Sequence, residues 1–231
     1  MEVVPVAFSE RKNYFKQYTI YIRKRRYILV IIETTEMQTT DTRNEIEQQA
    51  GVCRVLFEKK TRDYGTSWRV LRMPSLTDQI FIKANRIRSI QESGENRVGD
   101  DIRDEFVAMV NYAVMALIQG EVESGKWKVD SEDPMELSLD EAMRLYDKHL
   151  NATLELMLAK NHDYGEAWRQ MRVSSMVDLI LMKLRRIKQI EDNDGKTLVS
   201  EGVEGGYMDI INYSLFCLVR LTEDVNSTAN R

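Results

Sequence analysis

Residues 60–90 read KTRDYGTSWRVLRMPSLTDQIFIKANRIRSI, and residues 160–190 read KNHDYGEAWRQMRVSSMVDLILMKLRRIKQI. The two stretches align without a gap, and 14 of their 31 positions are identical. Both contain the pattern Asp-Tyr-Gly-x-x-Trp-Arg-x-x-Arg, which begins at Asp63 and returns 100 residues later at Asp163. This period is longer than the units of roughly 20–50 residues that build solenoids. The chain is therefore expected to be a duplicated half-domain, fused into a pseudo-dimer.

Composition sets broad limits on the function. The net charge of −4 argues against a general nucleic-acid coat, so direct nucleic-acid binding is not expected, although local basic faces stay open. Cys53 and Cys217 lie in apolar helical contexts without metal-ligand spacing, which favours buried thiols in a reducing compartment, the cytoplasm. The apolar run at residues 27–32 is far shorter than the roughly 20 residues that cross a bilayer, so no membrane association is expected.

The first 36 residues differ from the rest of the chain. They carry seven Lys or Arg residues against four Glu residues, and they have no counterpart in the second copy. We interpret residues 1–36 as a basic extension outside the domain, and a translation start at Met37 would explain it. A basic, β-like arm is the alternative interpretation.

From about Asp41 onward, apolar residues recur at the spacing of three and four that is typical of amphipathic helices. The pattern divides the chain into a first repeat at 41–120, a polar linker at 121–137, a second repeat at 138–222 and a polar tail at 223–231. Each repeat contains three helical segments. The predicted fold class is all-α, a helical bundle made of two tandem three-helix repeats.

Several residues mark the expected helix ends. Ser138-x-x-Glu141 has the spacing of a capping box and predicts a helix start. The same spacing at Ser75 and Ser175, each followed three residues later by aspartate, predicts the start of the second helix in each repeat. Gly65 and its counterpart in the second repeat stand where the first helix should end.

The duplicated turn carries an acid in an unusual place. Asp63 and Asp163 lie at a helix end, where an acidic side chain is unfavourable against the helix dipole. Binding a cation or an arginine would explain them, and capping of the neighbouring backbone is the alternative. Trp68 and Trp168 are interpreted as core anchors, with base stacking as the alternative.

Basic pairs recur at the same spacing on the second helix of each repeat. Lys83 precedes Arg86 by three residues, and Lys183 precedes Arg186 by three. Such pairs suit phosphate groups, because two charged donors can act on one anion. A solvated face, or partners for the aspartates of the turn, is the alternative.

The third helix of each repeat carries an Asn-Tyr pair, which begins at Asn111 and Asn212. An asparagine in an apolar helix needs a hydrogen-bond partner when it is buried, so its retention implies a specific contact. Just upstream, the first copy has Glu105 and the second has Asp209, three positions apart when the copies are overlaid. Carboxylates at that spacing share one helix face and suit Mg²⁺, so we predict these two acids as metal ligands.

These motifs together resemble the nucleotide modification associated domain 1 family of bacteria and phages. The resemblance rests on the Asp-Tyr-Gly-x-x-Trp turn, the Ser-x-x-Asp-x-Ile-x-x-Lys-x-x-Arg-Ile helix and the Asn-Tyr pair, and it covers residues 44–221 in two tandem copies. It implies an all-α domain linked to nucleotide or DNA-base metabolism. The composite acidic helix is also similar to all-α nucleoside triphosphate pyrophosphohydrolases of the dimeric dUTPase and MazG types. Those enzymes hold Mg²⁺ with a Glu-x-x-Glu and a Glu-x-x-Asp helix, and neither motif is intact in this chain.

The site is predicted where the Asp-Tyr-Gly turn meets the third helix. The residues predicted to bind nucleotide or phosphate are retained in both copies: Asp63, Tyr64, Arg72, Lys83, Arg86, Asn111, Asp163, Tyr164, Arg172, Lys183, Arg186 and Asn212. Because the third helices differ, the two sites are expected to be unequal, with one ligand per chain.

Three function classes remain open from the sequence. The first is a protein that binds a nucleotide or modified nucleotide, or a Mg²⁺-dependent nucleotide hydrolase. The second is a non-catalytic module that binds a nucleotide or a modified base. The third is a structural protein whose twin halves only reproduce a dimer. The chain is expected as a monomer, itself a pseudo-dimer, or as a homodimer.

Overall fold

The computed structural model describes the backbone of residues 26–197 and 202–229 and the side chains of residues 42–197 and 202–223. Throughout this part of the chain all regular secondary structure is helical, which confirms the all-α prediction. The α-helices are α1 (Arg26–Tyr64), α2 (Met73–Ser93), α3 (Ile102–Glu123), α4 (Leu139–Tyr164), α5 (Val173–Glu191) and α6 (Glu204–Ala229). Two short 3₁₀ helices, η1 (Ser67–Val70) and η2 (Ala167–Gln170), follow α1 and α4.

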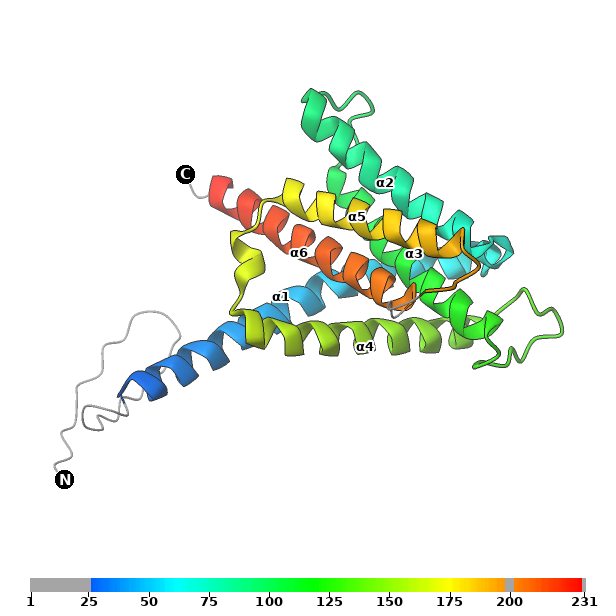
Figure 1. Ribbon diagram of the computed structural model, residues 1–231, viewed down its shortest axis with the longest axis horizontal. Coiled ribbons are helices and arrows are strands. Elements are labelled where there is room, and N and C mark those ends of the chain that lie inside the picture. The colour runs from blue at the N-terminus through cyan, green and yellow to red at the C-terminus, as the bar shows by residue number, and fades with distance from the viewer. Residues whose placement is uncertain (1–25, 198–201, 230–231) are drawn as a thin grey trace.

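The order α1–η1–α2–α3 repeats as α4–η2–α5–α6, and the two halves pack as one bundle (Figure 1). Equivalent helices face each other, since α3 packs on α6, α2 on α5 and α1 on α4. The remaining contacts between halves are reciprocal, because α1 also packs on α6 and α4 on α3. Reciprocal contacts are the mark of a two-fold interface. The pseudo-dimer predicted from the repeat is therefore the architecture of the chain.

Two ion pairs across the α2–α5 contact follow the same reciprocity. Asp78 Oδ1 lies 2.5 Å from Lys188 Nζ, and Asp178 Oδ1 lies 3.6 Å from an Arg88 guanidinium nitrogen. Asp78 and Asp178 occupy equivalent positions in the two repeats, and so do Arg88 and Lys188. Each aspartate therefore pairs with the basic residue of the other repeat. The duplicated aspartates help to set the register between the halves.

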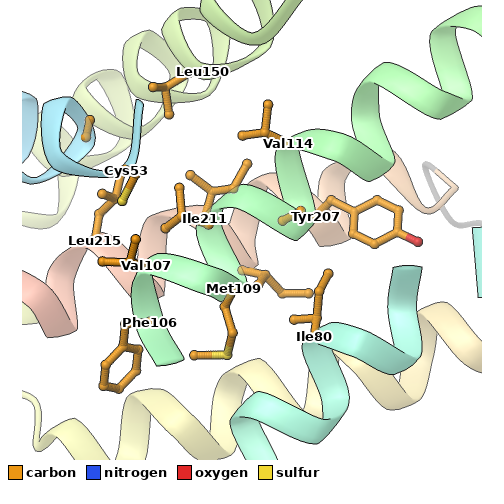
Figure 2. Packing of buried hydrophobic residues seen from close by; sticks show 14 of the residues in the cluster. Cys53, Ile80, Phe106, Val107, Met109, Val114, Leu150, Tyr207, Ile211 and Leu215 are labelled. Carbon is orange, nitrogen blue, oxygen red and sulfur yellow. The ribbon is translucent and has the colours of Figure 1, made fainter. Parts of the chain in front are cut away.

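The hydrophobic core is continuous across both repeats. Figure 2 shows side chains of the first repeat, such as Val107 and Met109, packed among side chains of the second, such as Ile211 and Leu215. Helices α3 and α6 lie at its centre, because buried side chains occupy most of their circumference. Each half also packs internally, with α2 on α3 and α5 on α6, and the single core extends across both halves.

The helix ends agree in part with the sequence. Ser138 and Glu141 form the predicted capping box, and Gly65 and Gly165 end α1 and α4 with positive φ values of 66° and 57°. The predicted caps at Ser75 and Ser175 are wrong.

Helices α2 and α5 begin two residues before those serines, after extended backbone at Arg72 and Arg172, and no side chain caps either start. In α2, Pro74 stands in the first turn, where its missing N–H costs no intrahelical bond. Ser75 therefore lies inside the helix, and its N–H donates to the Arg72 carbonyl at 2.9 Å.

The extension predicted at residues 1–36 lies mostly outside the described residues. The described backbone of α1 begins at Arg26, upstream of the periodicity that begins near Asp41. Whether the extension belongs to the domain stays a prediction. Within the described ranges, no helix combines the length and the apolar character needed to cross a membrane.

Candidate functional site

The duplicated Asp-Tyr-Gly-x-x-Trp motif forms a tight turn from the end of the first helix into a 3₁₀ helix. Trp68 and Trp168 are the side chains that anchor this turn, and they are only 8% and 5% exposed. Both indole rings belong to the hydrophobic core, which confirms the interpretation as core anchors. The indole N–H groups of both tryptophans have no hydrogen-bond partner among the described residues.

A pocket of about 290 Å³ opens beside the turn of the first repeat, and we call it the turn pocket. Helix α1, the turn and α3 each contribute to its wall. Its lining residues are Leu56, Phe57, Lys60, Thr61, Tyr64, Gly65, Ser67, Trp68, Leu71, Ala108, Asn111, Tyr112 and Met115. The pocket thus joins the Asp-Tyr-Gly-x-x-Trp motif to the Asn-Tyr pair, whereas Lys83, Arg86 and Glu105, which were predicted for the same site, do not line it.

The wall of the turn pocket is aromatic and carries a single cation. Tyr64 keeps 57% of its surface exposed at the mouth, and Tyr112 faces the same pocket from α3. Partial burial raises the pKa of Tyr64 above its usual value, and the charge of Asp63 and the nearby Tyr112 add to the shift. Tyr64 is therefore a neutral phenol at physiological pH. Lys60 supplies the positive charge.

Asn111 lines the pocket but uses its amide inside the protein. Its Nδ2 donates to the Cys53 carbonyl at 3.2 Å, and its Oδ1 accepts from the Tyr146 hydroxyl at 2.7 Å. This is the specific contact that a buried asparagine requires. In the second repeat, Asn212 is equally buried, and its Oδ1 has no hydrogen-bond partner within the described chain.

The second repeat places a larger side chain at the equivalent position. Phe216 stands where the first repeat has Met115, and its ring stacks on Trp168 with centroids 4.5 Å apart and planes at 8°. Tyr213 meets the edge of the same ring. The two turns are therefore unequal, as the divergence of the third helices suggested.

A different pocket, of about 300 Å³, opens in the second repeat between α4, α5 and the start of α6. We call it the cation pocket, because Lys160, Lys183 and Arg186 line it together with Asp209 and Glu204. The rest of the lining is Leu156, Ile187, Ile190, Gly202, Gly205, Gly206 and Met208.

The predicted basic pairs hold carboxylates in both repeats. In the first, Glu105 is 4% exposed, lies 3.1 Å from Lys83 Nζ and also pairs with Arg86. In the second, Asp209 lies 2.7 Å from Lys183 Nζ and 3.8 Å from Lys160 Nζ. The acid lies about one turn further along the third helix in the second repeat, and the lysine at the position equivalent to Lys83 still pairs with it.

These contacts do not fit a magnesium ion held by Glu105 and Asp209. The two acids lie in different repeats, and each faces ammonium or guanidinium groups that repel a cation. Across the part of the chain that the structure describes, no three His, Cys, Asp or Glu side chains gather as a metal site would require. Magnesium binding stays a prediction without a ligand set in these residues.

Other predicted residues lie on the surface. Asp63 and Asp163 are exposed at the ends of α1 and α4, as is Tyr164, and Arg72 and Arg172 are exposed before α2 and α5. None of these five lines either pocket.

Lys60 and Lys160 line the pockets but were not predicted as site residues, although both copies have a lysine at this position. The apolar residues of the pocket wall were not predicted either. Met115, for example, differs between the repeats and carries no motif.

Comparison with known proteins gives one match. A family model described as nucleotide modification associated domain 1 matches residues 60–119 and again residues 160–221. No curated protein and no solved structure matches the chain. The two matched segments begin at Lys60 and Lys160, so they contain the turn and the second and third helices of each repeat.

Proposed function

Because the chain belongs to the nucleotide modification associated domain 1 family, we propose that it binds a nucleotide or modified nucleotide and that the base occupies the turn pocket. The observation that carries the proposal is that the two motifs retained in both copies meet in the wall of one pocket.

The lining of the turn pocket suits a nucleobase. Tyr64 and Tyr112 both line the pocket with aromatic rings, one from α1 and one from α3. Stacking between a base and an aromatic ring contributes about 1–3 kcal/mol and tolerates different bases. A volume of about 290 Å³ lies at the lower end of the range for small-molecule sites, so it fits a base or nucleoside better than a whole dinucleotide.

Polar groups at the pocket supply orientation. Trp68 is a buried wall residue whose indole N–H has no acceptor among the described residues, but this nitrogen is closed to solvent, so a base reaches it only if the wall shifts. Lys60 is the cation of the wall and is exposed, so it can meet a phosphate outside the pocket. The nucleotide is therefore expected to bind with its base inside the pocket and its phosphate at the mouth.

Binding without catalysis is the form of the proposal that the side chains support best. Glu105 and Asp209, the acids predicted to hold a metal, already neutralise lysine and arginine. A Mg²⁺-dependent hydrolase is the second candidate, favoured only by the sequence resemblance. Incubation with each deoxynucleoside triphosphate and Mg²⁺, followed by assay for monophosphate and pyrophosphate, separates the two.

The matched pair Tyr64 and Tyr164 allows a controlled test. Tyr64→Ala is expected to weaken nucleotide binding about ten-fold, or about 1.4 kcal/mol, because it removes one stacking face. Tyr164→Ala is the control, because this side chain is 74% exposed and lines neither pocket. Titration calorimetry with a panel of nucleotides measures both variants.

Equal effects of the two substitutions would contradict the assignment of the turn pocket. If no nucleotide binds to the wild-type chain at millimolar concentration, the proposed function itself is wrong. Circular dichroism verifies that both variants remain folded, which is expected since both tyrosines are largely exposed.

A further inference from the structure

Two neighbouring helices expose apolar side chains at equivalent positions in the two repeats. Ile82 on α2 and Met182 on α5 are 54% and 53% exposed, and Phe81, which precedes Ile82, is 37% exposed. Leu181, the counterpart of Phe81, is partly buried against the core. None of these side chains lines the turn pocket or the cation pocket. Single exposed apolar residues are common on protein surfaces, but an exposed apolar pair that recurs in both repeats needs an explanation.

The helices that carry these residues form an outer layer of the bundle. Helices α2 and α5 pack on each other, and α3 and α6 separate them from α1 and α4 (Figure 1). One stripe of α2, at a spacing of three and four residues, is exposed, and it consists of Asp78, Ile82, Asn85 and Ser89. The four equivalent residues of α5 are exposed as well. We call the surface formed by these two stripes the outer face.

The pseudo-two-fold axis that relates the repeats crosses the outer face near its apolar residues. The two ion pairs across the α2–α5 contact join position 78 of one repeat to position 88 of the other. The axis that relates such pairs passes midway between them, at the level of residue 83 and its counterpart. Ile82 and Met182 are one residue away from that level, or about 1.5 Å along each helix, so they stand in the middle of the outer face.

Side chains of the two repeats already meet on the outer face. The ammonium group of Lys188 on α5 lies over the Phe81 ring of α2, 4.1 Å from its centroid. The apolar centre therefore extends across the α2–α5 contact and continues the interface between the halves.

Charges of both signs surround this apolar centre. Three acids and three bases flank it: Asp78, Asp178, Glu92, Arg88, Arg185 and Lys188. Five of the six form ion pairs on this surface, within α2 or between α2 and α5. The outer face thus has no excess of either sign, whereas a nucleic acid or an acidic membrane would require an excess of positive charge. An apolar centre within a polar rim is the usual anatomy of a protein–protein interface.

We propose that the outer face binds the outer face of a second copy of the chain. An interface between identical chains uses the same patch twice, so the patch must be complementary to itself. A patch that has its own pseudo-two-fold symmetry, an apolar centre and a neutral rim meets this requirement. The dimer contains four repeats, and it leaves the turn pocket open because that pocket is built from α1, the turn and α3.

The size of the outer face suits a dimer. Helix α2 has 21 residues and α5 has 19, which at 1.5 Å per residue gives a length of about 30 Å. Two packed helices cover a width of about 20 Å, so the footprint is roughly 600 Å² on each partner. Stable interfaces bury about 600–1,000 Å² on each partner, so the outer face lies at the lower end of that range.

The first experiment places charge in the centre of the outer face. Sedimentation equilibrium of the full chain over about 1–100 μM is expected to show twice the chain mass at the upper end. Ile82→Asp and Met182→Asp are each expected to weaken the association at least ten-fold, because each places one carboxylate from every copy in the buried centre. Val52→Asp is the matched control, since Val52 is 52% exposed but lies on α1 in the opposite layer. A wild type that stays monomeric, or an equal loss in the control, would overturn the inference.

The second experiment asks whether the partner is the same face. One double variant carries Ile82→Lys with Met182→Lys, and the other carries Ile82→Asp with Met182→Asp. Each is expected to be monomeric alone, and a one-to-one mixture is expected to regain the dimer, because opposite charges then meet whichever of the two positions face each other. If the folded variants stay monomeric when mixed, the outer face does not bind itself.

Persistent association of both double variants would also contradict the inference, and it would assign the contact to another surface or to residues 1–41. Circular dichroism verifies that the variants are folded, as expected for substitutions at exposed positions. If a double variant unfolds, Ile82→Gln takes its place, and an unchanged dimer in that uncharged variant would contradict the proposal.

This inference does not depend on nucleotide binding. Ile82→Asp is expected to leave the nucleotide affinity of the turn pocket unchanged, and Tyr64→Ala is expected to leave the dimer unchanged. Failure of the proposed base site and failure of the dimer are therefore distinguishable.

Discussion

Neither half of the chain is expected to have a folded monomeric state when it is produced alone. Helix α1 packs mainly on α4 and α6, and α3 packs on α6 as extensively as on α2, so a half-chain of residues 26–124 exposes much of its core. An isolated half therefore either unfolds or associates with a second copy, because exposed apolar faces of this kind are obligate interfaces. Circular dichroism and sedimentation over a dilution series measure both properties.

Mixing the two half-chains is expected to restore the helicity of the whole protein. The second half, residues 138–229, supplies α4, α5 and α6, and the reciprocal pairs of Asp78 with Lys188 and Asp178 with Arg88 favour the mixed complex in the native register. A half-chain that stays monomeric and unfolds cooperatively at the melting temperature of the full chain would contradict the single-bundle architecture.

The second large effect is expected at Arg169. Its guanidinium group pairs with carboxylates from three segments: Glu45 on α1, Glu166 in the turn and Glu223 on α6. It also donates to the Thr42 hydroxyl at 2.9 Å. Arg169→Met removes the cation that these three acids share, and of the three Glu223 keeps a further partner, Arg220, at 3.1 Å. We expect the free energy of unfolding to fall by about 3 kcal/mol, the lower end for a broken buried pair, since a quarter of the arginine side chain is exposed.

Arg43→Met is the matched control, because Arg43 also bonds two carboxylates but all three side chains are exposed. Surface pairs of this kind contribute about 0–1 kcal/mol. Denaturant unfolding at neutral pH compares the two variants. Lowering the pH toward the range in which carboxylates protonate is expected to reduce the loss in Arg169→Met, because neutral acids no longer repel. A loss of similar size in both variants, or one that does not depend on pH, would contradict a central ionic role for Arg169.

The fold was predicted well from the sequence because the same pattern of helical segments occurs twice, and each copy supports the assignment made for the other. Some positions retained in both copies proved structural, as with Trp68 and Trp168 in the core. The prediction for Asp78 and Asp178 was wrong in mechanism. Their spacing from a serine indicated a cap, whereas the structure uses them across the interface between halves. Local spacing cannot reveal a partner that lies more than a hundred residues away in the chain.

The candidate site was predicted in outline only. The meeting of the turn with the third helix followed from the retained Tyr64 and Asn111, and both line the turn pocket. The pairing of Glu105 with Lys83 and Arg86 was not foreseen, because helical spacing places acids on one face without showing which cations face them. The pockets of the two repeats likewise differ through single replacements, such as Phe216 in place of Met115. The sequence alone does not show how such a replacement changes the packing.

The central claim is that a nucleobase occupies the turn pocket. A crystal structure of the full chain with a non-hydrolysable nucleotide and Mg²⁺ tests it most directly. The predicted result is a base stacked against Tyr64 or Tyr112 in the turn pocket, with a phosphate toward Lys60. A nucleotide bound with its base outside the turn pocket would contradict the account.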